Sequence, residues 1–147
     1  MHREADAIWR DGPHVGKGTV STLSGVLNNA HYVFGLAETS SCTTPGELLA
    51  AAIASSMSRM VALKMVGLGA KPAGVETHAL IAFEDSGERW RMTAVHLEIK
   101  ARAVDITSDC FEEAVQDAIR NCPITSQLNL AVEHTAQLEP PDASVAA

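Results

Sequence analysis

The sequence predicts a single α+β domain, and two kinds of pattern carry this prediction. Residues 75–83 and 95–103 alternate apolar with polar positions, which is typical of half-buried strands. Residues 46–68 and 109–121 instead carry helix start and stop signals. With the flanking segments, the expected order is β-β-β-α-β-β-α-β, and a chain of 147 residues fits one domain of this layout.

The first three strands are expected near the start of the chain. Residues 4–10 form a short apolar run with a charged end. Residues 15–23 and 26–35 flank Ser24-Gly25, and small and β-branched residues dominate the first of these two segments. Because glycine marks a turn between two such runs, we expect them to form a β-hairpin.

The first helix has a clear start at Thr44, which is followed by Pro45 and Glu47. This is the capping-box pattern with proline at the first helical position. Apolar side chains then occupy nearly every face of 46–68, which predicts a buried helix. One small sheet cannot cover such a helix on all sides, so we expect an oligomer in which two chains share a core.

The same helix is long enough to raise the question of a membrane span. Arg59, Lys64 and the serines at positions 55, 56 and 58 argue against a span, because polar groups in lipid are costly. The two basic side chains can pair with a buried carboxylate or a ligand anion, or extend to the edge of the apolar surface. The formal net charge of −7 also disfavours nucleic acid and anionic membrane surfaces as partners.

Turn and cap signals organise the second half of the chain. Asp85-Ser86-Gly87 predicts the turn between the two alternating strands. Asp109, with Glu112 three residues later, predicts the start of the helix over 109–121, and Pro123 predicts its end. A further short helical piece is expected to begin at this proline.

The chain is expected to close with a strand over 130–138, which makes residues 1–138 the domain. Residues 139–147 are rich in proline and alanine and are expected to be a disordered tail. Three cysteines are too few, and odd in number, for a secreted disulfide framework. The N-terminus also has no apolar signal region, so we expect a cytoplasmic protein.

The three cysteines are the first candidates for chemistry. Cys42 lies just ahead of the first helix, Cys110 lies in the first turn of the second, and Cys122 precedes Pro123. Helix N-termini favour the reactive thiolate form of cysteine. The alternative for each residue is a small buried apolar side chain without reactivity.

Other polar residues have ready structural explanations. Glu47 can serve as an acid or base, but the capping box accounts for it. The six histidines show no zinc-type spacing, and no dinucleotide or phosphate-binding motif is present, so we expect neither a metal nor a cofactor. His134 falls on the apolar face of the last strand and is expected to be a core histidine with its hydrogen bonds satisfied.

Three stretches of the sequence resemble the OsmC/Ohr family of osmotically inducible and organic hydroperoxide resistance proteins. Residues 16–28 (GKGTVSTLSGVLN) resemble the family's N-terminal strands. Residues 44–52 (TPGELLAAA) resemble the start of its first helix, and 122–125 (CPIT) resemble its Cys-Pro motif. The similarity covers nearly the whole chain, and the order of elements agrees.

The resemblance implies an intertwined homodimer in which two central helices are wrapped by antiparallel sheets, with sites at the subunit interface. It also implies reduction of organic hydroperoxides in oxidative-stress defence. A peroxidatic cysteine on the first central helix attacks the peroxide, and a resolving cysteine in the Cys-Pro motif then forms a disulfide with it. An arginine and a glutamate activate the first thiol.

Only part of this catalytic set is present here. By the resemblance, Ser56 occupies the peroxidatic position, Cys122 the resolving position and Gly46 the position of the activating glutamate. Residues 35–43, where the arginine is expected, contain none. A serine hydroxyl has no sulfenic acid state and is not ionised without a neighbouring base, so the family reaction is expected to be lost.

Three functions follow as hypotheses. The first is a dimeric scaffold whose interface pocket takes a small apolar ligand or a hydroperoxide without turnover. The second is a thiol peroxidase or redox protein in which Cys42 substitutes for the missing sulfur and pairs with Cys122. The third is a purely structural or interaction protein, which a wide ligand-free apolar surface would favour.

Overall fold

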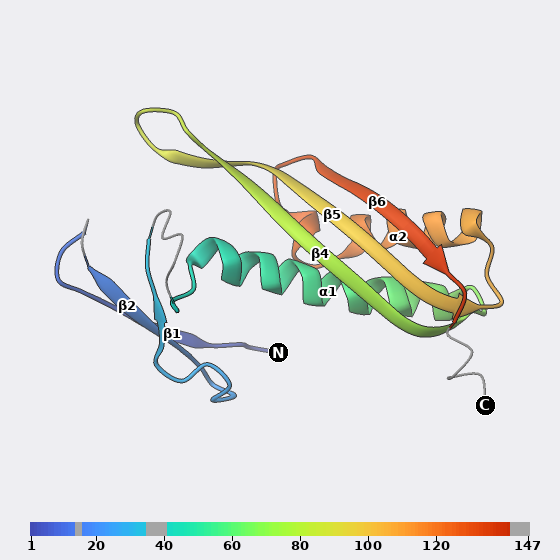
Figure 1. Ribbon diagram of the computed structural model, residues 1–147, viewed down its shortest axis with the longest axis horizontal. Coiled ribbons are helices and arrows are strands. Elements are labelled where there is room, and N and C mark those ends of the chain that lie inside the picture. Colours follow the sequence, from blue (N-terminus) through green and yellow to red (C-terminus); the bar gives the residue numbers. More distant parts are fainter. Residues whose placement is uncertain (14–15, 35–40, 142–147) are drawn as a thin grey trace. The chain divides into compact units, whose positions relative to one another are not determined.

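The computed structural model describes residues 1–13, 16–34 and 41–141 (Figure 1). The chain divides into two compact units, residues 1–49 and 50–147, and each is described here by itself. Every strand and helix expected from the sequence is present in one or the other unit.

The first unit is a three-stranded antiparallel sheet of β1 (Ala5–Arg10), β2 (Lys17–Thr22) and β3 (Ala30–Tyr32), in that order. The rings of Trp9 and Tyr32 pack with centroids 5.6 Å apart. Gly18 lies opposite Tyr32 in the sheet, and a Cβ at Gly18 would stand 2.2 Å from the tyrosine ring. Only glycine therefore fits beneath this ring. β2 and β3 confirm the predicted hairpin.

The start of α1 (Pro45–Gly67) confirms the predicted capping box. The backbone N–H of Glu47 donates to Oγ1 of Thr44 at 3.2 Å, and the N–H of Thr44 donates to Oε2 of Glu47 at 2.9 Å. Thr43 adds a hydroxyl bond to the same carboxylate. These bonds satisfy backbone donors that a helix N-terminus leaves without partners.

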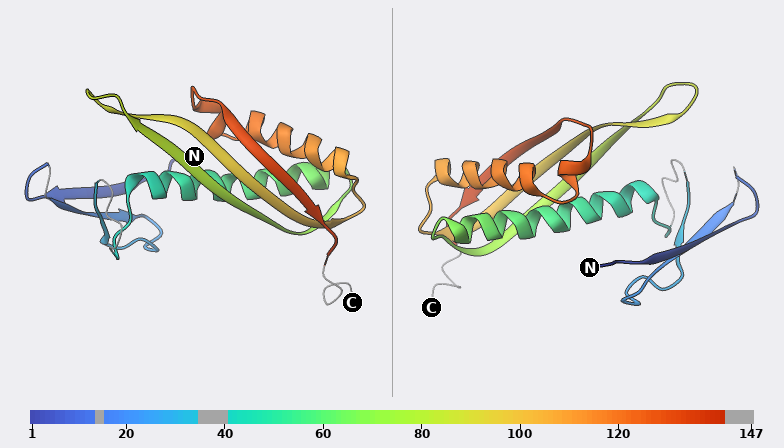
Figure 2. Two further views of the ribbon diagram at one scale, coloured as in Figure 1. Left: turned by 45° about the horizontal axis from the view of Figure 1, so that its top comes forward. Right: turned by 180° about the vertical axis from the view of Figure 1, so that it is seen from behind.

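The second unit contains the sheet β4-β5-β6, formed by β4 (Lys71–Asp85), β5 (Trp90–Val104) and β6 (Val132–Glu139). Figure 2 shows α1 and α2 (Ser108–Asn121) side by side on one face of this sheet. A short 3₁₀ turn, η1 (Thr125–Gln127), follows α2. β4 and β5 are longer than predicted because their antiparallel pairing continues to Asp85 and Trp90, on either side of the turn.

β6 corrects one feature of the predicted architecture, in which the wrapping sheets were antiparallel. β6 runs parallel to β5, with Val95 paired to Val132 and Arg102 paired to Glu139. The reason is the α2 crossover, which returns the chain to the same end of the sheet before β6 begins. β6 also extends through Glu139, one residue into the predicted tail, and residues 142–147 lie outside the described part.

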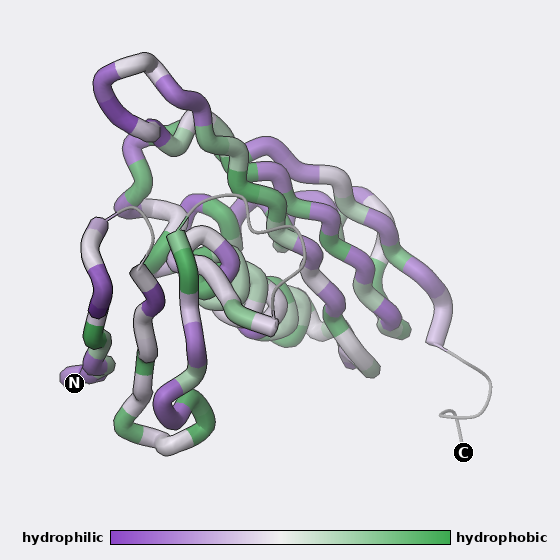
Figure 3. The backbone as a smooth tube through the Cα atoms, turned by 60° about the vertical axis from the view of Figure 1, so that its left-hand side comes forward, coloured by the Kyte–Doolittle hydropathy of each residue, from purple (hydrophilic) through white to green (hydrophobic). Residues whose placement is uncertain are grey.

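The core of the second unit lies between the two helices and the sheet. α1 contributes four fully buried side chains at intervals of four residues, namely Ile53, Met57, Val61 and Met65. β5 contributes alternate residues from Val95 to Ala103, as its sequence pattern predicted, and Figure 3 shows the alternating hydropathy along the strands. Each buried aliphatic side chain of this kind stabilises the fold by about 1.5–3 kcal/mol.

As expected for a helix that one small sheet cannot cover on all sides, only this stripe of α1 is fully buried within one chain. Leu63, Val66 and Leu68 remain exposed by 48%, 57% and 48%. By length and composition α1 would be able to cross a membrane, a test that the core helix of a soluble protein also passes. Within one chain, α1 therefore has one buried apolar face and a second apolar face that is exposed to solvent.

The N-cap of α2 is another correction. Thr107, rather than Asp109, caps the helix, because its hydroxyl accepts the N–H of Cys110 at 3.2 Å. Asp109 lies in the first helical turn, where its negative charge suits the helix dipole.

α2 and β6 are joined by a hydrogen bond between Glu112 and His134. Nε2 of His134 lies 2.7 Å from Oε1 of Glu112, and the histidine side chain is only 20% exposed. The prediction of a satisfied, largely buried histidine is confirmed. The hydrogen bond from His134, and then that from Gln116, hold the pKa of Glu112 below its ordinary value.

We predict that Glu112→Gln reduces the acid sensitivity of folding. Because the pKa of Glu112 is lowered in the folded state, its contribution is present above the unfolded pKa and is lost as pH falls through the folded pKa. Glu112 is 42% exposed, so the loss at neutral pH should stay below about 1 kcal/mol. The free energy of unfolding, measured by urea titration at pH values from neutral to roughly 3, should fall less steeply for the variant than for the unsubstituted protein. Glu113→Gln is the control, and equal pH dependence of the two variants would contradict the assignment.

Candidate functional site

Two residues singled out in the sequence meet between α1 and α2. Oγ of Ser56 lies 3.3 Å from Sγ of Cys122, although the two residues are 66 positions apart in the chain. Ser56 is half-buried beside the apolar stripe of α1, and Cys122 is fully buried immediately after α2. The positions that the resemblance assigns to the peroxidatic and resolving residues are thus in direct contact.

The local backbone explains how the sulfur is placed. Cys122 adopts an extended conformation, with φ −64° and ψ 126°, because the residue before a proline is disfavoured in the helical region. The following turn folds back on α2 and the cysteine. Oγ1 of Thr125 donates to the carbonyl of Ile119 at 3.0 Å, and the N–H of Ser126 donates to the carbonyl of Cys122 at 3.0 Å.

The surroundings of Cys122 act on its ionisation in opposite directions. Burial, the largest influence, raises the pKa of the thiol. Hydrogen bonding with Ser56, followed by hydrogen bonding with Thr125 and Ile124, lowers it. The hydrogen bonds together outweigh burial, so the pKa of Cys122 lies below its ordinary value and the thiolate is favoured.

Two further candidates, Gly46 and Cys42, lie in the first unit. Gly46 is in the first turn of α1 and offers no carboxylate, while the carboxylate of its neighbour Glu47 is engaged in the capping box. Cys42 is half-buried next to Thr43, which bridges to Tyr32 of β3. Cys42 and Cys122 belong to different units, so their pairing stays a prediction. Residues 35–40 lie outside the described part.

Several supporting residues were not found from the sequence. Thr125 belongs to the Cys-Pro motif, and its hydrogen bonding with Cys122 lowers the pKa of the thiol. Ser58 donates to Oγ1 of Thr77 at 2.8 Å and ties α1 to β4. Lys64 pairs with Asp117 of α2, which settles one of the two alternatives for that lysine. In the described part of the chain, no three His, Cys, Asp or Glu side chains converge on a metal position.

Sequence comparison places the chain in a known family. The family model described as OsmC-like protein matches residues 38–137. The chain belongs to the OsmC-like family. This OsmC-like protein is also 30% identical, over 140 residues, to the peroxiredoxin OsmC of Escherichia coli strain K12. The match covers 95% of this chain and 98% of that relative, and the same values hold for the peroxiredoxin OsmC of Shigella flexneri.

Solved structures confirm the α+β fold class. The OsmC-like protein of Mycoplasma pneumoniae superposes with a TM-score of 0.76 at 10% identity, covering 94% of this chain and 97% of that one. An organic hydroperoxide resistance protein OsmC from Legionella pneumophila superposes with a TM-score of 0.68 at 16% identity, covering 95% and 97%. The resemblance seen in the sequence is therefore confirmed in both sequence and fold.

We predict that Ser56→Ala raises the pKa of Cys122, because the substitution removes a hydrogen bond that favours the thiolate. The measurement is a pH titration of thiolate ultraviolet absorbance in a Cys42→Ser, Cys110→Ser background, where Cys122 is the sole thiol. Ser55→Ala is the matched control, because the Ser55 hydroxyl donates to the carbonyl of Ala52 within α1. An unchanged midpoint in Ser56→Ala would show that the hydroxyl does not stabilise the thiolate.

Proposed function

We propose that this OsmC-like protein is a binding protein that has lost the peroxidatic step of its family. It takes a small apolar molecule or an organic hydroperoxide, without turnover, at the interface of a cytoplasmic homodimer. The observation that carries the proposal is the Ser56–Cys122 contact, in which an oxygen stands 3.3 Å from the remaining sulfur. Its relatives, which include a peroxiredoxin and an organic hydroperoxide resistance protein, suggest the class of ligand.

Oxygen and sulfur differ in the chemistry that this position requires. A peroxidatic thiolate attacks the peroxide, becomes a sulfenic acid and releases an alcohol, after which a second thiol expels water to form a disulfide. Ser56 offers a hydroxyl, which has no matching oxidation state. The absence of a carboxylate at Gly46, and of an arginine in 35–43, supports the same reading, because the groups that would activate a nucleophile are missing as well.

The apolar face of α1 supports the homodimer. Leu63 and Val66 are about half exposed on a helix whose opposite face is fully buried, and Leu68, just beyond the helix end, is exposed to a similar degree. A second chain covering this face would bury apolar surface at about 25 cal/mol for each Å² removed from water. An open groove of about 660 Å³ runs along the same helix, with Met60, Leu63 and Leu68 in its lining, and offers room for a small ligand.

We predict that the purified chain sediments as a dimer and that Leu63→Glu shifts it toward the monomer, because a charge would be buried in an apolar contact. Analytical ultracentrifugation across a concentration series measures the mass. Fractionation of expressing cells is expected to place the protein in the soluble cytoplasmic fraction. A monomer at all concentrations would contradict the homodimer and the interface site together.

We predict that the protein binds cumene hydroperoxide without consuming it. Calorimetric titration should show saturable binding, while peroxide remaining after incubation with a dithiol reductant should equal that of a cysteine-free control. Consumption well above the control, abolished by Cys122→Ser, would overturn the binding function. Ser56→Cys serves as the reference variant, since the 3.3 Å contact should let its new thiol form a disulfide with Cys122 on oxidation.

A second candidate function is a redox protein in which Cys42 replaces the missing sulfur. The lowered pKa of Cys122 favours it, because a thiolate can act as nucleophile toward an oxidised partner thiol. The peroxide-treated samples of the same experiment distinguish the two functions. A Cys42–Cys122 disulfide in their mass spectra would support the redox protein, and two reduced thiols would exclude it.

A further inference from the structure

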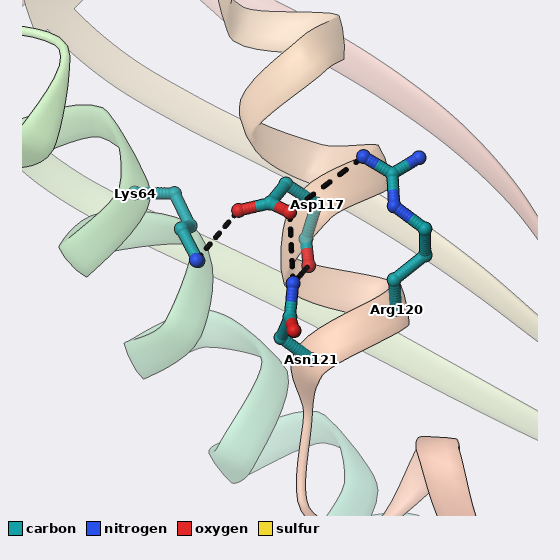
Figure 4. Close-up of polar contacts among 4 residues, drawn as sticks. All are labelled: Lys64, Asp117, Arg120 and Asn121. Atoms are coloured by element: carbon teal, nitrogen blue, oxygen red, sulfur yellow. Dashed lines mark hydrogen bonds and ion pairs between the residues drawn. The ribbon is translucent and has the colours of Figure 1, made fainter.

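Asp117 forms the centre of a polar network that, like the Ser56–Cys122 contact, joins α1 to the C-terminal end of α2. Figure 4 shows its carboxylate facing Lys64 of α1 on one side and Arg120 and Asn121 of α2 on the other. Nδ2 of Asn121 donates to both Oδ1 and the backbone carbonyl of Asp117, at 2.8 and 2.9 Å. The Arg120 guanidinium lies 3.6 Å from Oδ1. One carboxylate thus links α1 to the last helical residue before Cys122.

The polar network and the thiol contact are two separate contacts, called tethers here, between the same pair of antiparallel helices. On α1 the tethers involve Ser56 and Lys64, which are roughly 12 Å apart along the axis at 1.5 Å per residue. On the other side they involve Asp117 of α2 and Cys122, which directly follows α2. A single tether would leave the helices free to slide, whereas two separated tethers set their register. A slide of about 2.7 Å, half a helical turn, would take Sγ beyond hydrogen-bond reach of Ser56.

We propose that Asp117 is a positioning residue for the Cys122 thiol: its bonds to Lys64 and Asn121 hold the end of α2 so that the sulfur stays against the Ser56 hydroxyl. The inference goes beyond the proposed function, because it concerns the thiol whether or not a ligand is bound. Asp117 does not touch the thiol and acts through the helix that carries it.

The alternative source of register is apolar packing. Phe111, Ala114, Val115 and Ala118 are the buried residues of α2. Cys122, however, lies one turn beyond the last of them, and the polar network occupies that final turn. Asp117 and Lys64 are about one-third exposed, so bulk salt should weaken this tether more than it weakens the buried contacts.

The sign of a titration shift separates positioning from direct electrostatics. Removing the negative charge of Asp117 would leave the positive charges of Lys64 and Arg120 uncompensated. This electrostatic change by itself would favour the Cys122 thiolate and lower the pH midpoint of its titration. Loss of the Ser56 hydrogen bond through a displaced helix end would raise the midpoint. Asp117→Asn should therefore raise the Cys122 midpoint if Asp117 acts by positioning the helix, and lower it if Asp117 acts by direct electrostatics. The substitution changes the size of the side chain very little.

The experiment measures the pH titration of Cys122 by thiolate absorbance in the Cys42→Ser, Cys110→Ser background. Four variants are compared in this background: Asp117→Asn, Ser56→Ala, the double variant that combines these two substitutions, and Glu113→Gln. Glu113 lies one turn earlier on α2 and lines the same groove, which makes it a matched control. We expect Asp117→Asn to raise the midpoint by most of the shift seen in Ser56→Ala, the double variant to match Ser56→Ala, and Glu113→Gln to leave it unchanged.

An unchanged or lowered midpoint in Asp117→Asn would overturn the inference, as would a further rise in the double variant. A second readout uses Ser56→Cys, in which oxidation closes a disulfide to Cys122. Adding Asp117→Asn should slow that closure several-fold, whereas Glu113→Gln should not. A role of Asp117 confined to stability would lower the melting temperature and leave both the midpoint and the rate of closure in place.

Discussion

The packing of one stripe of α1 on the sheet is the constraint on which the site depends. Ile53, Met57, Val61 and Met65 recur every four residues, so one face of the helix is fixed against the strands. Once this face is fixed, the direction of every other α1 side chain follows from helical geometry. Ser56 then points toward the end of α2, and Ser58 toward Thr77 of β4. The apolar periodicity of the helix therefore determines where its polar groups act.

The site built on this frame keeps the features that stabilise a thiolate while lacking a second sulfur. Hydrogen bonding with Ser56, Thr125 and Ile124 outweighs the effect of burial on the pKa of Cys122. In a two-cysteine site such hydrogen bonding would stabilise the thiolate released when the disulfide is reduced. Here the Ser56 hydroxyl, at the position that the family resemblance assigns to the peroxidatic residue, lies 3.3 Å from Sγ of Cys122.

Much of the architecture was accessible from the sequence because its signals are local. The capping box at Thr44 and Glu47, the alternation of β5 and the two helices each depend on residues close together in the chain. The parallel pairing of β6 was missed because strand direction depends on the crossover and not on the strand's own residues. Thr107 was missed as the N-cap because Asp109, with Glu112 after it, offered a competing signal.

The site was predictable only in part for a similar reason. Family resemblance paired Ser56 with Cys122, but no spacing pattern could show that Thr125 would turn back on the thiol, or that Lys64 would meet Asp117. Both contacts join residues from elements that become neighbours only after folding. Charged residues on an apolar helix were a usable signal that some partner existed, and the partner's identity required the tertiary structure.

The parallel arrangement of β5 and β6 has a consequence for how the chain folds. The β4–β5 hairpin joins neighbours in sequence and can form early, whereas β6 must wait until α2 has carried the chain back along the sheet. During synthesis β6 also leaves the ribosome after β4, β5 and α2. Until then the β5 edge that β6 will occupy has unsatisfied backbone groups, and an emerging chain is open to mispairing with another copy at that edge.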